Sequence, residues 1–170
     1  MFPSSTAAVT VQTPSGNPVE DATVRLRKDD EIVASVSGQT DADGTFTQSG
    51  IEQGTYSVVV ESAGYYGTEK SLYVATNSGT TVTLEPGSVT VEFRTLDGRF
   101  DEDSPIAANV EIYDGSQFVS NISTGASGTR GVSLDVNANY RVVVKKPGYA
   151  REEQTLSTGE NDSAVTYSIN

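Results

Sequence analysis

Asp41 and Asp43 stand one residue apart and are followed by Gly44, an arrangement that could hold a metal ion. Carboxylate oxygens are ligands that Ca²⁺ prefers, and a following glycine permits the sharp turn of a calcium-binding loop. A complete loop also needs further acidic ligands at regular spacing and a distal glutamate, which the residues after Gly44 do not supply. The pattern therefore favours a hairpin turn with solvated carboxylates, with a Ca²⁺ site as the alternative.

A second acidic cluster, Asp101, Glu102 and Asp103, follows Phe100 in what we expect to be a long loop. Such a cluster could bind a cation or contact a basic surface on a partner protein. Loops carry function more often than the strands they connect. An acidic loop is nevertheless most often solvated, so the sequence favours a solvated loop and keeps cation or partner binding as the alternative.

Tyr66 is the aromatic residue best suited to stacking against a sugar ring. The dipeptide Gly-Tyr at 64–65 recurs at 148–149, which indicates that both of these tyrosines are structural residues packed at a strand corner. The residue after the second dipeptide is Ala150, so Tyr66 has no aromatic counterpart and no shared packing role. We therefore expect Tyr66 to be the better candidate for a glycan contact.

The sequence lacks the residues that most enzymes use, because it contains no histidine and no cysteine. Without histidine it has neither the commonest general base near neutral pH nor the commonest zinc ligand. Without cysteine it has no disulfide, no thiolate nucleophile and no thiolate metal ligand. We therefore expect a protein that is not an enzyme and needs no cofactor.

The net charge of −12, from 23 acidic and 11 basic residues, restricts the partners further. A field of this sign repels phosphate backbones and anionic membrane surfaces, so we expect no nucleic-acid partner. Only four of the basic residues are lysines, and an acidic surface poor in lysine is typical of proteins from high-salt organisms. An ordinary acidic secreted or viral domain is the alternative.

No apolar run approaches the roughly 20 residues that cross a bilayer, so we expect no membrane insertion. The first eight residues have neither a basic region nor an apolar one, which predicts that no signal peptide is present. On this interpretation the protein is not exported by that route, or Met1 is the start of an excised piece.

The two halves of the chain resemble each other at an offset of 84 residues, the difference between positions 56 and 140. Residues 56–60 align with 140–144, and upstream 22–26 align with 108–112 after a small gap. After a larger gap, Val9-Thr10-Val11 is aligned with Val89-Thr90-Val91. A repeat of this length suits a small domain, and we expect domains at 1–85 and 86–170.

The matched blocks predict β-strands. Apolar residues alternate with polar ones, the period of a half-buried strand, and Asp43-Gly44 favours a tight hairpin. No stretch has the apolar spacing of a helix. About seven short strands for each repeat, with frequent turn signals, predict an all-β protein of two tandem seven-stranded Greek-key sandwiches similar to the immunoglobulin fold.

Several spaced motifs carry a family resemblance. They are Gly16-x-Pro18-Val19-x-x-Ala22-x-Val24, Thr40-Asp41-x-Asp43-Gly44-x-Phe46, Gly54-x-Tyr56-x-Val58 and Gly64-Tyr65. In this order and spacing, the chain resembles the carboxypeptidase regulatory-like (transthyretin-like) domain family over residues 7–85. The second half looks like a diverged copy, in which 125–128 replace the acidic turn. The resemblance implies a sandwich that serves as a folding, spacing or adhesion module.

Three classes of function remain open at this point. The first is a virion structural protein of a virus of a halophile, such as a capsid decoration, turret or tail protein. It would act as a docking and spacer or receptor-facing module on the virion surface, within a homo- or hetero-oligomer of capsid or tail subunits. We expect residues 1–8, with Phe2 and Pro3, to contribute to docking.

The second class is an excised cell-surface or secreted module that adheres to a host-surface glycan or protein. An enzyme is the third, and only scattered carboxylates support it.

Overall fold

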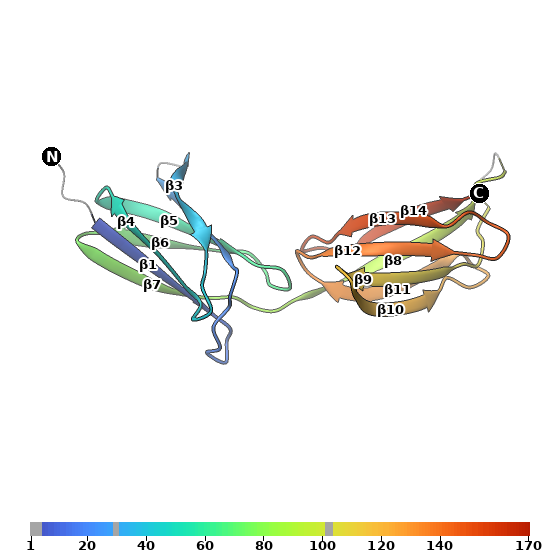
Figure 1. Cartoon of the computed structure of the whole chain (residues 1–170), viewed down its shortest axis with the longest axis horizontal. Helices are drawn as coiled ribbons and strands as arrows, with labels where there is room; N and C mark the ends of the chain where they lie inside the picture. Colours follow the sequence, from blue (N-terminus) through green and yellow to red (C-terminus); the bar gives the residue numbers. More distant parts are fainter. Residues whose placement is uncertain (1–4, 29–30, 101–103) are drawn as a thin grey trace. The chain divides into compact units, whose positions relative to one another are not determined.

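The computed structural model describes residues 5–28, 31–100 and 104–170, and every regular element in these ranges is a β-strand (Figure 1). The described residues include no helix long and apolar enough to cross a membrane. The chain divides into two compact units, Met1–Pro86 and Gly87–Asn170. The predicted all-β fold of two seven-stranded sandwiches is confirmed.

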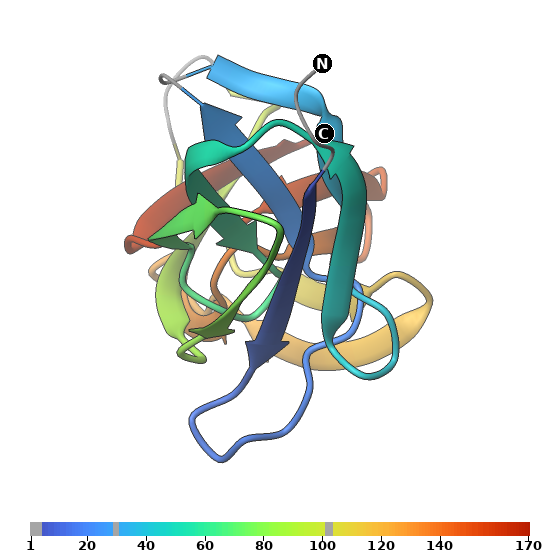
Figure 2. The ribbon, with the colours of Figure 1, turned by 90° about the vertical axis from the view of Figure 1, so that its left-hand side faces the viewer.

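The first unit contains seven strands in two sheets. They are β1 (Ser5–Gln12), β2 (Thr23–Lys28), β3 (Glu31–Gln39), β4 (Thr45–Ile51), β5 (Gly54–Glu61), β6 (Thr68–Val74) and β7 (Asn77–Thr83). One sheet has the order β4-β1-β7 and the other β3-β2-β5-β6. Figure 2 shows β1 between β4 and β7.

The second unit repeats this arrangement. Its strands are β8 (Ser88–Asp97), β9 (Asn109–Asp114), β10 (Gln117–Ser123), β11 (Thr129–Asp135), β12 (Asn139–Lys145), β13 (Glu152–Ser157) and β14 (Ser163–Ile169). The sheet orders are β11-β8-β14 and β10-β9-β12-β13. Each strand of the second unit therefore takes the place of the strand seven positions earlier in the first.

Each core is formed by strands in which buried and exposed residues alternate. Along β1, every second residue from Ser5 to Val11 is buried, and the residues between them are partly exposed. Strands that alternate in this way present one face to the other sheet and one to solvent. In the first unit the buried face includes Val9, Val24 and Val58, and in the second Phe93, Val110 and Tyr167. Each unit therefore has its own apolar core.

Backbone hydrogen bonds correct one part of the internal alignment. The N–H of Val11 donates to the carbonyl of Gly44 at 2.7 Å, and the N–H of Thr95 donates to that of Gly128 at 2.8 Å. Since Gly44 and Gly128 are aligned, Val11 corresponds to Thr95, at the offset of 84 found elsewhere. The alignment of residues 9–11 with 89–91 is therefore wrong, and residues 93–95 are their true counterparts.

A buried threonine closes the same loop in both units. In the first, the Thr40 hydroxyl donates to the carbonyl of Val19 at 2.7 Å and accepts the N–H of Ala22 at 2.9 Å. In the second, the Thr124 hydroxyl accepts the N–H of Ala108 at 3.0 Å. Both threonines are almost fully buried. Each one fixes the connection that precedes the second strand of its unit.

Candidate functional site

The carboxylate of Asp41 caps its own turn. Its Oδ1 accepts the N–H of Asp43 at 3.0 Å and the N–H of Thr45 at 2.9 Å. Aspartates at turns commonly accept such hydrogen bonds from the backbone. The geometry therefore explains the presence of Asp41 in this turn without a metal ion. Within the described ranges, no group of three or more acidic side chains lies close enough together to hold a metal ion.

Tyr66 lies after β5 with 37% of its surface exposed. Its backbone N–H donates to the carbonyl of Glu85 at 2.9 Å. Tyr65 and Tyr149 instead pack against the cores of their own units, in keeping with the structural role expected of them. The glycan contact at Tyr66 stays a prediction.

Five candidate residues lie outside the described residues. Phe2 and Pro3 belong to the segment expected to dock, and Asp101, Glu102 and Asp103 belong to the acidic loop. The predictions made for these two segments stay predictions.

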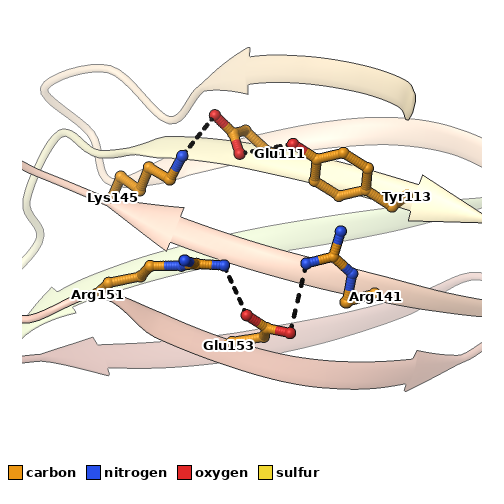
Figure 3. A network of polar contacts seen from close by, with 6 residues as sticks. All are labelled: Glu111, Tyr113, Arg141, Lys145, Arg151 and Glu153. Carbon is orange, nitrogen blue, oxygen red and sulfur yellow. Dashed lines mark hydrogen bonds and ion pairs between the residues drawn. The ribbon is translucent and has the colours of Figure 1, made fainter. Parts of the chain in front are cut away.

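A network of charged side chains covers the outer face of β9, β12 and β13 (Figure 3). Lys145 Nζ lies 3.0 Å from Glu111 Oε1, and the Tyr113 hydroxyl donates to Glu111 Oε2 at 2.9 Å. Glu153 joins two arginines, with Arg151 at 2.7 Å and Arg141 at 3.4 Å. The Arg141 guanidinium also lies 4.3 Å from the centre of the Tyr113 ring.

Val143 lies in the middle of this outer face and is nevertheless fully buried. Its neighbours Val142 and Val144 point into the core, so Val143 points outward. Across the sheet it pairs with Glu111 on one side and Glu153 on the other. The long side chains of the network therefore cover Val143 with their aliphatic parts, as exposed lysines and arginines often do. Part of the network is thus structural.

Contacts within the network shift the pKa values of Glu111 and Tyr113. The hydrogen bond from Lys145 holds the pKa of Glu111 below its usual value, so Glu111 stays ionised. The bond to Glu111 raises the pKa of Tyr113 above its usual value, so Tyr113 stays protonated. Neither group exchanges a proton near neutral pH, which disfavours acid–base catalysis on this face.

Asp97, Arg99 and Tyr149 form a second cluster in the same unit. Asp97 accepts two side-chain bonds from Arg99, at 3.0 and 2.9 Å, and one from the Tyr149 hydroxyl at 2.6 Å. The Arg99 guanidinium lies 3.9 Å from the centre of the Tyr149 ring. The bond from Arg99 holds the pKa of Asp97 well below its usual range. This cluster fixes the ring of Tyr149.

Beside this cluster is a hollow of about 400 Å³. It is lined by Asn109, Lys145, Lys146, Pro147, Tyr149 and Arg151. The hollow lies at the end of β12 and in the loop that leads to β13. Sequence reasoning singled out only Tyr149 among these residues, and as a structural tyrosine, although adjacent lysines in a chain with only four were a usable signal.

Two seven-stranded sandwiches, with apolar cores and ionic groups on their outer faces, define an all-β sandwich protein. Residues 6–95 match the model of the carboxypeptidase regulatory-like domain. This match covers more than half of the 170 residues, and the chain belongs to the carboxypeptidase regulatory-like domain family. No curated protein sequence matches the chain.

Solved structures resemble the chain at low sequence identity. The Bacillus anthracis TIE protein is 14% identical with a TM-score of 0.50, over 98% of this chain and 34% of that protein. A streptococcal ancillary pilin is 17% identical with a TM-score of 0.47, over 98% of this chain and 62% of the pilin. The minor pilin of Streptococcus agalactiae is 12% identical with a TM-score of 0.43, over 97% and 95%. The likeness to the TIE protein shows the fold, and this chain spans about a third of that protein.

Proposed function

We propose that this chain is a non-enzymatic surface module that separates its partners and carries mechanical load between its two ends. The observation that carries the proposal is the parallel pairing of the first and last strands in each unit. β1 pairs in parallel with β7 from Thr6↔Asn77 to Gln12↔Thr83. β8 pairs in parallel with β14 from Val91↔Ser163 to Asp97↔Ile169.

Parallel pairing decides how a pulling force reaches the hydrogen bonds. In each unit the chain enters at the start of the first strand and leaves at the end of the last strand, so these two points lie at opposite ends of one ladder. A force along the chain then shears the ladder and loads its bonds together. In an antiparallel terminal pair, the same force would open the bonds one at a time. Both units therefore suit a tether under tension.

The chemistry of the surface supports a role without catalysis. The chain contains no histidine or cysteine. In the network of Figure 3, every carboxylate is held by a cation and Tyr113 is held by Glu111. Such groups stabilise a surface and leave no poised general base.

Force spectroscopy on single molecules tests the proposal. The full chain is pulled first from its two termini and then from cysteines introduced by Ser15→Cys and Glu85→Cys, which lie just beyond the same end of the β1–β7 ladder. Because the chain has no cysteine of its own, these handles are unique. The first unit should resist terminal pulling at a several-fold higher force than pulling from 15 and 85. Equal forces in the two geometries would overturn the load-bearing role.

The narrower predictions concern where the module is displayed. Decoration of the virion of a halophile's virus, and adhesion at a cell surface, both fit a spacer with a net charge of −12. Light scattering after size-exclusion chromatography, in low and in molar salt, helps to distinguish the virion subunit from the cell-surface module. Salt of this strength reduces the range of charge repulsion to about 3 Å. An oligomer that forms only there favours the assembly subunit, and a monomer in both favours a module that docks on another molecule.

A further inference from the structure

We infer that the hollow at the end of β12 in the second unit binds an acidic sugar, through its carboxylate and one face of its ring. Its volume of about 400 Å³ lies within the range of about 300–1,000 Å³ that is usual for small-molecule sites. The lining combines three cations, one amide and two side chains with flat apolar surfaces. This inference is independent of the proposed load-bearing role.

The cations of the hollow differ in how much of their charge is already used. Lys145 is paired with Glu111 at 3.0 Å, and Arg151 is paired with Glu153 at 2.7 Å. Lys146 has no carboxylate partner among the residues that the structure describes. Its ammonium lies 5.9 Å from the centre of the Tyr149 ring. In a chain with a net charge of −12, a lysine without a carboxylate partner in the same hollow as two other cations creates an unusual local field. It favours an anion at this point.

The apolar part of the hollow is fixed before any ligand arrives. Tyr149 is held by its bond to Asp97 at 2.6 Å and by the guanidinium of Arg99 at 3.9 Å from the ring centre. Pro147 lies two residues earlier and is rigid by nature. A preorganised surface of this kind loses little conformational freedom on binding. Ring surfaces beside the Asn109 amide match the C–H face and hydroxyl groups of a sugar, whereas an acidic peptide needs only the cations.

The first unit serves as an internal comparison. It keeps the Gly-Tyr dipeptide at 64–65, equivalent to 148–149. At the positions of Lys145, Lys146 and Arg151 it has Glu61, Ser62 and Gly67. The same fold therefore forms without these cations. Their presence in the second unit is a property of the surface and not a requirement of the sandwich.

Calorimetric titration with digalacturonic acid tests the inference, with its dimethyl ester as the neutral counterpart. The variant Lys146→Gln removes the uncompensated charge, and Arg130→Gln removes one positive charge from an exposed position on β11 of the same unit. We expect binding of the acid to weaken about tenfold in Lys146→Gln, the loss of one charge-assisted hydrogen bond. It should stay unchanged in Arg130→Gln, and the ester should bind about tenfold more weakly than the acid to the unchanged chain.

Three outcomes would overturn the inference: equal loss in the two variants, equal binding of acid and ester, or no binding of the acid while a tetraglutamate peptide binds. Both variants are first checked for unchanged thermal unfolding, because neither residue belongs to a core. A second readout is the amide shift of residues 145–151 on adding the acid. The unfolding force of Lys146→Gln should equal that of the unchanged chain, so a failure here is distinguishable from a failure of the load-bearing role.

Discussion

Replacing Thr40 by valine should destabilise the first unit by about 2–6 kcal/mol. The hydroxyl of Thr40 has two buried partners, the carbonyl of Val19 at 2.7 Å and the N–H of Ala22 at 2.9 Å. Valine keeps the size of the side chain but leaves both groups without this partner. A buried polar group left unsatisfied costs about 1–3 kcal/mol, so two such groups cost about 2–6 kcal/mol.

The second unit supplies a sharper version of the same experiment. Thr124→Val also removes the acceptor of a backbone N–H, that of Ala108 at 3.0 Å. The carbonyl of Ile106, however, keeps the hydroxyl of Thr95, which lies 2.5 Å from it. The Thr95 hydroxyl loses its contact with the Thr124 hydroxyl at 2.7 Å but retains the one to Ile106, so only the N–H of Ala108 is left with no partner. Thr124→Val should therefore cost about 1–3 kcal/mol, less than Thr40→Val.

Differential scanning calorimetry of the full chain measures both effects, since each variant should move the transition of its own unit. For a domain of this size, about 2 kcal/mol corresponds to a decrease of roughly 8 °C or more in Tm. Thr47→Val, at an exposed position on β4, is the matched control and should leave Tm nearly unchanged. If Thr40→Val has the same Tm as the Thr47→Val control, or if Thr124→Val lowers Tm more than Thr40→Val does, the buried hydroxyl is not what fixes the loop.

Gly16→Ala should destabilise the first unit by about 1–2 kcal/mol, the backbone strain of a non-glycine residue at positive φ. Gly44→Ala should destabilise it by considerably more, and urea unfolding of both variants measures the difference. Gly44 and Gly16 both have positive φ, but only at Gly44 would an added Cβ meet a backbone atom, the carbonyl oxygen of Val11 at 2.5 Å. Burial raises the pKa of Tyr167 to about 12, so stability should fall as pH rises from about 10, the unfolded value, to about 12. Tyr167→Phe should remove this alkaline loss in urea titrations. The lowered pKa of Asp97 contributes stability that is present above its unfolded value of about 3.9 and is lost as pH falls below it, so Asp97→Asn should flatten the acid limb of the same titrations.

Local sequence pattern was sufficient to predict the strands but not their exact correspondence between the units. Burial along β1 and β8 alternates with a period of two residues. Offsets of 80 and 84 therefore place apolar residues on the same face, and the pattern cannot choose between them. Only the hydrogen bonds from residues 11 and 95 to the aligned glycines fix the register.

The candidate site was harder to predict because its contacts cross between strands. In the first unit Arg25 pairs with Glu61 at 2.7 Å, and in the second Glu111 pairs with Lys145 at 3.0 Å. The two pairs occupy equivalent diagonals of equivalent sheets, with the charges exchanged. When the sequences of the two units are compared one position at a time, these residues count as two mismatches. The structure shows one interaction, in which complementarity matters and the sign at each position does not.

Comparison of the two units separates what the fold requires from what one surface adds. The buried threonines at 40 and 124, the tight glycines at 44 and 128, and the parallel terminal ladders occur in both. The load-bearing role that we propose therefore rests on the same pairing in both units. The cations of the hollow at 145, 146 and 151 have Glu61, Ser62 and Gly67 as their counterparts in the first unit. The hollow lies on the sheet of β9, β12 and β13, whereas the terminal ladder of that unit belongs to the sheet of β8 and β14. Because the two features use different sheets, the surface of the hollow can change without altering the hydrogen bonds of the terminal ladder.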